Sequence, residues 1–195
     1  MTPHDNNNHH HRPAVQPARV DNNRSATESQ PPSTSNRPSV AMTAVHGKAI
    51  DWESINWESS GGRLFIDRPL APHTWFQVGG KADIFFIADR EPALKQFLQL
   101  LPATMPRLVI GAASNLLVRD GGFRGAVIKL GKDFQTANLQ DGFIVAGAAM
   151  LVASLAQWAM TNAYKGFAFY CGIPGTVGGA VAMNAGCFGG ETRDL

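Results

Sequence analysis

The pattern of hydrophobic and polar positions predicts a strand followed by a helix after residue 80. The apolar run Asp83 to Ile87 (DIFFI) follows two glycines and is typical of a buried strand. Downstream, apolar side chains recur at the i, i+3, i+4 and i+7 spacing of a helix with one buried stripe, at Leu94, Phe97, Leu98 and Leu101. We expect Asp89 to cap this helix and Pro102 to end it.

Three further strands and a second helix are expected before the glycine-rich C-terminal part. The strands are Arg107 to Ile110, Ala126 to Leu130 and Phe143 to Ala146, the last preceded by a hairpin turn at Asp141 and Gly142. Leu151 to Tyr164 is expected to be a helix ended by Gly166, with a buried stripe at Val152, Leu155, Ala156 and Ala159. This order of elements predicts a mixed α and β domain.

The first 48 residues have a different composition. Residues 1–40 contain six prolines and six asparagines but no glycine, leucine or aromatic residue. Such a segment cannot bury enough apolar surface to offset the entropy of ordering it, so we expect residues 1–48 to be a disordered low-complexity tail. Because Met42 follows directly, we also hypothesise that Met42 is the biological start.

Charge and composition exclude several classes of function. The formal charge of +2, from 17 basic and 15 acidic residues, is too small for a nucleic-acid-binding surface. No apolar run is long enough for a membrane span, and no secretory signal is recognisable, so we expect a cytoplasmic protein. Cys171 and Cys187 lack metal-ligand spacing, and His73 is the only histidine after residue 46, so we expect no metal site and no histidine-based triad.

The first candidate site is the loop after the strand at Arg107 to Ile110. Gly111, Ala112, Ala113 and Ser114 have short side chains that leave backbone N–H groups able to face an anion, and Asn115 can hold the turn. The loop is neither a dinucleotide-binding fingerprint nor a P-loop. Taken alone, such a loop between strands is more often an ordinary turn than a ligand site.

The second candidate site lies within Gly166 to Gly190, where glycines alternate with apolar residues. Pro174 stiffens the chain between two glycines, and Gly178 with Gly179 permits close approach of a ligand. Asn184 offers the only side-chain amide in the apolar run from Ala180 to Gly186. The alternative is a buried helix start with packed glycines and a satisfied asparagine. Together the two sites favour a cofactor with phosphates and a large apolar ring, whereas Arg119, Arg124 and Lys129 are either phosphate ligands or surface charges.

Three segments resemble one enzyme family, in order and in spacing: HTWFQVGGKADIFF, VIGAASNLLVRDGGFRGAVIKL and GIPGTVGGAVAMNAGCFGGETRDL. The chain resembles the N-terminal part of the UDP-N-acetylenolpyruvoylglucosamine reductases, also called UDP-N-acetylmuramate dehydrogenases. The resemblance implies an α+β FAD-binding fold of the vanillyl-alcohol oxidase and p-cresol methylhydroxylase type, truncated here. It implies hydride transfer from NADPH, by way of FAD, to the enolpyruvyl ether of a UDP-sugar in peptidoglycan precursor synthesis.

The same resemblance assigns cofactor-binding residues to both candidate sites. It implies that the pyrophosphate lies on Gly111, Ala112, Ala113, Ser114 and Asn115. The flavin and its phosphates are then expected along the second site, at Ile173, Pro174, Gly175, Gly178, Gly179, Asn184 and Gly186.

The sequence departs from the family pattern in three respects. Ala113 stands where the family pattern GxGSN has a glycine, and Ala168 stands where a glutamate is common. The family's catalytic arginine, serine and carboxylate, together with its substrate-binding domain, follow the point where this chain ends. We therefore expect residues 49–195 to be an FAD-binding domain of two subdomains, the second incomplete, with no catalytic residue of its own.

Two other functions remain open at this point. One is a different flavin-dependent oxidase of the same fold, and the other is a non-catalytic nucleotide-binding module. The sequence predicts no oligomeric state.

Overall fold

The computed structural model describes residues 42–45 and 48–195. Strands β1 (Met42–Val45) and β2 (Lys48–Asp51) pair antiparallel as a two-stranded sheet. Of the predicted disordered tail, residues 1–48, only residues 42–45 and Lys48 are described. The hypothesis that Met42 is the biological start concerns the residues before it, which lie outside the described part.

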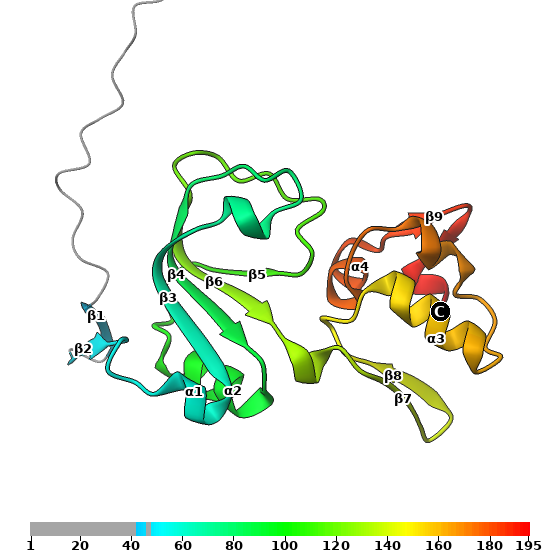
Figure 1. Cartoon of the computed structure of the whole chain (residues 1–195), viewed down its shortest axis with the longest axis horizontal. Coiled ribbons are helices and arrows are strands. Elements are labelled where there is room, and N and C mark those ends of the chain that lie inside the picture. The colour runs from blue at the N-terminus through cyan, green and yellow to red at the C-terminus, as the bar shows by residue number, and fades with distance from the viewer. Residues whose placement is uncertain (1–41, 46–47) are drawn as a thin grey trace, which may run out of the picture. The chain divides into compact units, whose positions relative to one another are not determined.

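A four-stranded sheet in the order β3-β4-β6-β5 organises the following residues (Figure 1). Its strands are β3 (Gly62–Pro69), β4 (Lys81–Ala88), β5 (Arg107–Ile110) and β6 (Phe123–Leu130). The strand β3 pairs antiparallel with β4, whereas β6 pairs parallel with both β4 and β5. The predicted strands within β4, β5 and β6 are confirmed, and β3 is an additional strand that the hydrophobic pattern did not reveal.

One face of this sheet is covered by an aromatic core. The helices α1 (Trp57–Ser60) and α2 (Glu91–Leu100) pack there with Trp52. The rings of Phe86 and Phe97 stack 4.1 Å apart, and Trp57 meets both of them edge-on. The indole Nε1 of Trp52 is buried without a hydrogen-bond partner.

The predicted helix at α2 is confirmed, but two details of the prediction are wrong. Its N-cap is Arg90, because the Asp89 carboxylate instead accepts hydrogen bonds from Arg63 and from the Lys132 amide. Of the predicted stripe, Phe97 and Leu101 are buried and Leu94 packs against the same core, but Leu98 is 39% exposed. Ala93, which the prediction did not include, is buried in place of Leu98.

The opposite face of the sheet has a second, smaller core. It contains Leu70, Ala82, Phe85, Ile110 and Val127. The short 3-10 helix η1 (Ala71–His73) brings the imidazole of His73 against the ring of Phe85, with centroids 4.4 Å apart.

The remaining residues form a third hydrophobic cluster. After the 3-10 helix η2 (Lys132–Phe134), β7 (Ala137–Gln140) and β8 (Phe143–Ala146) form a hairpin. Asp141 and Gly142 both have positive φ at its turn, as predicted. The helix α3 (Val152–Thr161) buries all four predicted stripe residues, but it ends at Asn162, well before Gly166.

The glycine-rich C-terminal part folds against this third cluster. Its elements are η3 (Ala168–Gly172), α4 (Val177–Met183), β9 (Gly186–Cys187), β10 (Gly190–Glu191) and η4 (Thr192–Asp194). Phe169, Tyr170 and Ala180 are buried with Met150, Val152, Leu155 and Ala156. The second candidate site is therefore a short helix between two packed turns rather than an open loop.

Candidate functional site

The two glycine-rich segments meet although they are far apart in the chain. The hydroxyl of Ser114 donates a hydrogen bond to the carbonyl oxygen of Pro174. The side-chain Nδ2 of the neighbouring Asn115 donates a hydrogen bond to the sulfur of Met183 at 3.5 Å. These contacts connect the loop after β5 directly to the segment that contains α4.

A cavity of about 240 Å³ lies between the two segments. Its walls come from residues 108–116 and from residues 173–185, and they are mainly apolar. Nine of the twelve predicted cofactor-binding residues line this cavity: Gly111, Ala112, Ala113, Ser114, Asn115, Ile173, Pro174, Gly175 and Gly179. The structure thus brings together most of what the sequence assigned to two separate sites.

The loop after β5 presents backbone amides that donate no hydrogen bond to the described part of the chain. Among the described residues, no protein acceptor is found for the amide N–H groups of Ala112, Ala113, Ser114 and Asn115. Ala113 has a φ of 51°, in the left-handed region that favours glycine. Free amides in such a turn form a concave anion site, so the loop suits a phosphate group.

Thr176 determines how closely the two segments approach. A Cβ added to Gly111 would lie 2.1 Å from Thr176 Oγ1, a separation that real Cβ atoms do not adopt. Thr176 is 7% exposed, and its hydroxyl oxygen caps α4 by accepting a hydrogen bond from the amide of Gly179 at 3.4 Å. Thr176 was not among the predicted site residues. A threonine two residues before the glycine pair Gly178-Gly179 was nevertheless a recognisable N-cap signal.

Gly178 packs against a turn between β8 and α3 that was not among the predicted site segments. Its amide donates to the carbonyl oxygen of Ala148 at 2.9 Å, and an added Cβ would lie 3.0 Å from the Cβ of Ala148. Gly178, Ala148, Ala149 and Thr176 line a further cavity of about 180 Å³. Small residues between β8 and α3 therefore contribute to the same region as the two predicted segments.

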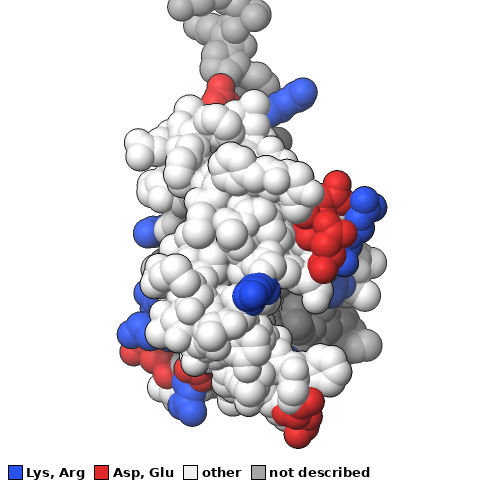
Figure 2. Space-filling view, turned by 90° about the vertical axis from the view of Figure 1, so that its right-hand side faces the viewer, with Lys and Arg blue, Asp and Glu red and all other residues white. Residues whose placement is uncertain are grey.

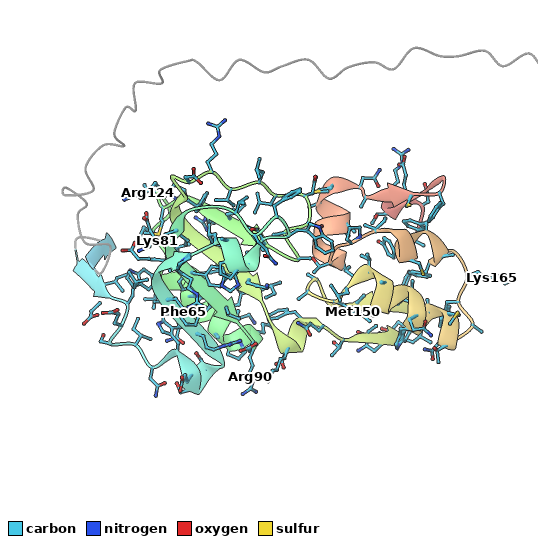
Figure 3. All side chains as sticks on the ribbon, turned by 45° about the horizontal axis from the view of Figure 1, so that its top comes forward. Phe65, Lys81, Arg90, Arg124, Met150 and Lys165 are labelled. Atoms are coloured by element: carbon cyan, nitrogen blue, oxygen red, sulfur yellow. The ribbon has the colours of Figure 1, made fainter. Side chains whose placement is uncertain are left out.

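A third, more polar cavity of about 320 Å³ adjoins Gly111 and Ala112. Polar side chains in its wall come from Lys129, Gln135, Ser154 and Thr176, and Met150, labelled in Figure 3, adds an apolar surface. Of the three basic residues considered as phosphate ligands, Lys129 is the one that lines a cavity here. Arg124 instead forms an ion pair with Asp83 at 3.2 Å, and Arg119 is exposed.

Asn184 and Gly186 do not line any of these cavities. The side-chain Nδ2 of Asn184 donates to Glu191 Oε2 at 2.8 Å, and its Oδ1 accepts from the backbone amide of Arg193 at 3.0 Å. Gly186 pairs with Glu191 in the short ladder of β9 and β10. The amide of Asn184 is thus engaged within the chain, which matches the alternative of a satisfied asparagine.

His73 lies on the sheet face that also carries Lys129. Burial, followed by the positive charges of Lys129 and Arg68, lowers the pKa of His73 below its ordinary value. The Nε of Arg68 is 3.5 Å from His73 Nε2, a geometry in which the neutral imidazole accepts the hydrogen bond.

The described part of the chain offers no other obvious chemistry. Within residues 42–45 and 48–195, no three metal-ligating side chains cluster, and Cys171 and Cys187 are free thiols. None of the helices described there is long and apolar enough to cross a membrane. Figure 2 shows one face of the molecule on which uncharged side chains predominate and the acidic and basic groups are scattered.

The donor set therefore fits a phosphate-bearing cofactor with an apolar ring. Unengaged amides are suited to phosphate, and the apolar walls of the first cavity are suited to a ring. Lys129, next to Gly111 in the polar cavity, supplies a positive charge nearby.

Comparisons with known proteins agree with this geometry. Residues 82–195 match the family model of the FAD binding domain. The chain is 51% identical over 135 residues to the UDP-N-acetylenolpyruvoylglucosamine reductase of Phenylobacterium zucineum (strain HLK1), an alignment that covers 69% of this chain and 45% of that protein. The corresponding values for the reductase of the same name from Caulobacter sp. (strain K31) are 53% identity over 135 residues, covering 69% and 44%.

A solved structure shows similarity to a reductase of the same kind. The crystal structure of UDP-N-acetylenolpyruvylglucosamine reductase (MurB) from Thermus caldophilus superposes with a TM-score of 0.56 at 35% identity, covering 68% of this chain and 46% of that one. The aligned region thus spans less than half the length of these relatives. The chain belongs to the FAD binding domain family, in the group formed by the UDP-N-acetylenolpyruvoylglucosamine reductases.

Proposed function

We propose that this chain binds FAD for a reductase that transfers hydride from NADPH to the enolpyruvyl group of UDP-N-acetylglucosamine, forming UDP-N-acetylmuramate. The reaction would belong to peptidoglycan precursor synthesis in the cytoplasm. The observation that carries the proposal is the convergence of the loop after β5 and the α4 segment on one cavity, with unengaged amides on one side. Bound FAD would supply the hydride chemistry.

The residues of this chain then have binding and positioning roles. The amides of Ala112 to Asn115 would hold the pyrophosphate, and Gly111 would let the backbone approach it. The walls formed by Ile173 and Pro174 would exclude water from the flavin, with Gly175 and Gly179 allowing close approach. Gly178 would act by packing on Ala148, and Asn184 and Gly186 would shape the turn behind α4 rather than touch the cofactor.

The reduction itself demands groups of a different kind. When hydride reaches the carbon remote from the carboxylate, negative charge develops as an enolate, and the adjacent carbon must then receive a proton. None of the twelve proposed site residues has a side chain that ionises near neutral pH. We therefore propose that the catalytic acid and the enolate-stabilising groups lie outside this chain, and that residues 49–195 act as its FAD-binding domain after a tail of residues 1–48.

A two-part measurement on the purified 195-residue chain tests the proposal. We expect FAD to bind, as followed by a change in flavin fluorescence, and we expect no substrate-dependent oxidation of NADPH. The matched control is the Gly111→Ala variant, in which FAD binding should be lost or strongly weakened. Failure of the unaltered chain to bind FAD would contradict the binding role, and measurable turnover would contradict the placement of the catalytic groups.

A further inference from the structure

Two adjacent aromatic side chains are exposed in the loop between η1 and β4. Trp75 is 61% exposed and Phe76 is 55% exposed, whereas Trp52 and Trp57 are buried in the core. Exposing a large aromatic ring leaves apolar surface in water, and neighbouring exposed rings often mark a site of binding. The family resemblance and the cavities described above give these two rings no role.

The loop that carries them is held in place by its own hydrogen bonds. Thr74 is 7% exposed, and its hydroxyl lies 3.1 Å from the carbonyl oxygen of Ala71 and 3.0 Å from that of Val78. The amide of Gly80 donates to the carbonyl oxygen of Arg119 at 2.9 Å. A ring displayed on such a loop loses little freedom when a ligand stacks on it, which favours binding.

Trp75 is connected directly to the candidate phosphate loop. Its backbone amide donates to the carbonyl oxygen of Ala113 at 3.3 Å. Ala113 is the left-handed residue among the four whose amides are unengaged. In any nucleotide only a ribose separates the base from its phosphates, so an aromatic residue hydrogen-bonded to a phosphate loop is within the region that the base can reach.

We propose that the indole of Trp75 is a stacking platform for the adenine ring of FAD, and so favours FAD over FMN, which lacks adenosine. This inference rests on the proposed function, because it takes the loop from Ala112 to Asn115 as the pyrophosphate site. Stacking of a base on an aromatic side chain corresponds to roughly a five- to hundredfold change in affinity when the ring is removed.

Equilibrium titrations of the full 195-residue chain with FAD, FMN and ADP test this inference. The variant Trp75→Ala should bind FAD and ADP roughly five- to hundredfold more weakly and FMN unchanged. Trp75→Phe should retain most of the affinity, because it keeps an aromatic face. The control is Phe143→Ala, which removes an aromatic ring that is 75% exposed but lies on the β7–β8 hairpin.

Each other outcome contradicts the inference in a distinct way. An unchanged FAD and ADP affinity in Trp75→Ala means that adenine does not use this ring. An equal loss for FAD and FMN places Trp75 beside the flavin half or shows a general disturbance of the loop. If Trp75→Ala proves unstable by its urea midpoint, Trp75→Gln tests the same point with a longer polar side chain.

The titration also separates this inference from the proposed function. Binding of FAD by the unaltered chain with no effect of Trp75 leaves the proposed function intact and refutes the platform. A chain that binds ADP through Trp75 but does not bind FAD contradicts both the FAD role and a platform for the adenine of FAD. A chain that binds none of the three ligands contradicts both.

Discussion

The hydroxyl of Ser114 donates a hydrogen bond to the carbonyl oxygen of Pro174, which is sixty residues further along the chain. This contact joins the loop after β5 to the segment before α4, and both segments line the same cavity. The cavity therefore depends on a tertiary contact rather than on either glycine-rich segment alone.

Replacing Ser114 tests the value of that contact. We expect Ser114→Ala to lower the free energy of unfolding by about 1 kcal/mol, the usual contribution of one hydrogen bond, and to weaken FAD binding. Urea unfolding and flavin titration would measure the two effects. Ser114→Thr keeps a hydroxyl and should lose less; equal losses in both variants would show that packing, not the hydrogen bond, matters here.

Gly111 and Thr176 are expected to be energetically coupled. Gly111→Ala should destabilise the fold by roughly 1–3 kcal/mol, because the new methyl group overlaps the buried Thr176 hydroxyl. Thr176→Ala alone should cost about 1 kcal/mol as a lost helix cap. The double variant should lose less than the two single effects combined, as measured by urea unfolding.

Gly121, where an added Cβ would have free space, provides the control for this pair. An added Cβ at Gly121 would meet nothing within 4 Å, so Gly121→Ala should leave the unfolding free energy nearly unchanged. Strict additivity of Gly111→Ala and Thr176→Ala would contradict the predicted overlap.

Substitution by glycine is expected to change the free energy of unfolding in opposite directions at Ala113 and Ala112. Ala113 has a φ of 51°, which costs an L-residue about 1 kcal/mol, so Ala113→Gly should raise the free energy of unfolding by up to about that amount. Ala112 is not among the residues with positive φ, and Ala112→Gly should lower stability through the entropy of the unfolded chain. Thermal or urea unfolding of both variants would compare them, and a loss of stability in both would contradict the strain at Ala113.

His73 is expected to make stability depend on pH. Burial and the charges of Lys129 and Arg68 lower its pKa in the folded state below the ordinary 6.5 of the unfolded state. The unfolded chain therefore binds more protons in the window below 6.5, so the stability present above that pH is lost as the pH falls toward the folded pKa.

Two measurements check this dependence. The unfolding free energy of the unaltered chain should fall more steeply between about pH 7 and pH 5 than that of His73→Gln. The imidazole signal that disappears in His73→Gln should titrate with a midpoint below 6.5 in nuclear magnetic resonance spectra. Parallel pH profiles of the two proteins would refute the prediction.

Asn184 is expected to matter for stability more than for contact with the cofactor. In Asn184→Asp the donor to Glu191 is replaced by a second carboxylate, which should lower the free energy of unfolding by roughly 1–3 kcal/mol. Asn138→Asp, at an exposed position on β7, is the matched control and should change little. A large loss of FAD affinity with no loss of stability would instead support direct contact between Asn184 and the flavin.

The sequence predicted elements well where one face is buried at a regular spacing. Val152, Leu155, Ala156 and Ala159 are all buried in α3, and the turn at Asp141 has the expected positive φ. The strand β3 was missed because it is an edge strand with charged residues, Arg63, Asp67 and Arg68, interrupting its apolar positions. Edge strands commonly carry such charges, which hide the alternation of apolar positions.

The candidate site was predictable in outline but not in its contacts. Glycine density pointed to Gly111 and Gly178 because the backbone must approach another group there. Which group it approaches depends on tertiary packing, so neither Thr176 opposite Gly111 nor Ala148 opposite Gly178 was identified. The same limit applies to Asn184, whose partners Glu191 and Arg193 are set by the turn after α4.

The separation between Ser114 and Pro174 also has a consequence for biosynthesis. Translation proceeds at about 5–20 residues per second, so the segment before α4 leaves the ribosome roughly 3–12 s after the loop that it joins. During that interval the loop has only one wall of the cavity beside it. Under the proposed function, FAD loading would therefore wait until the segment before α4 has been made.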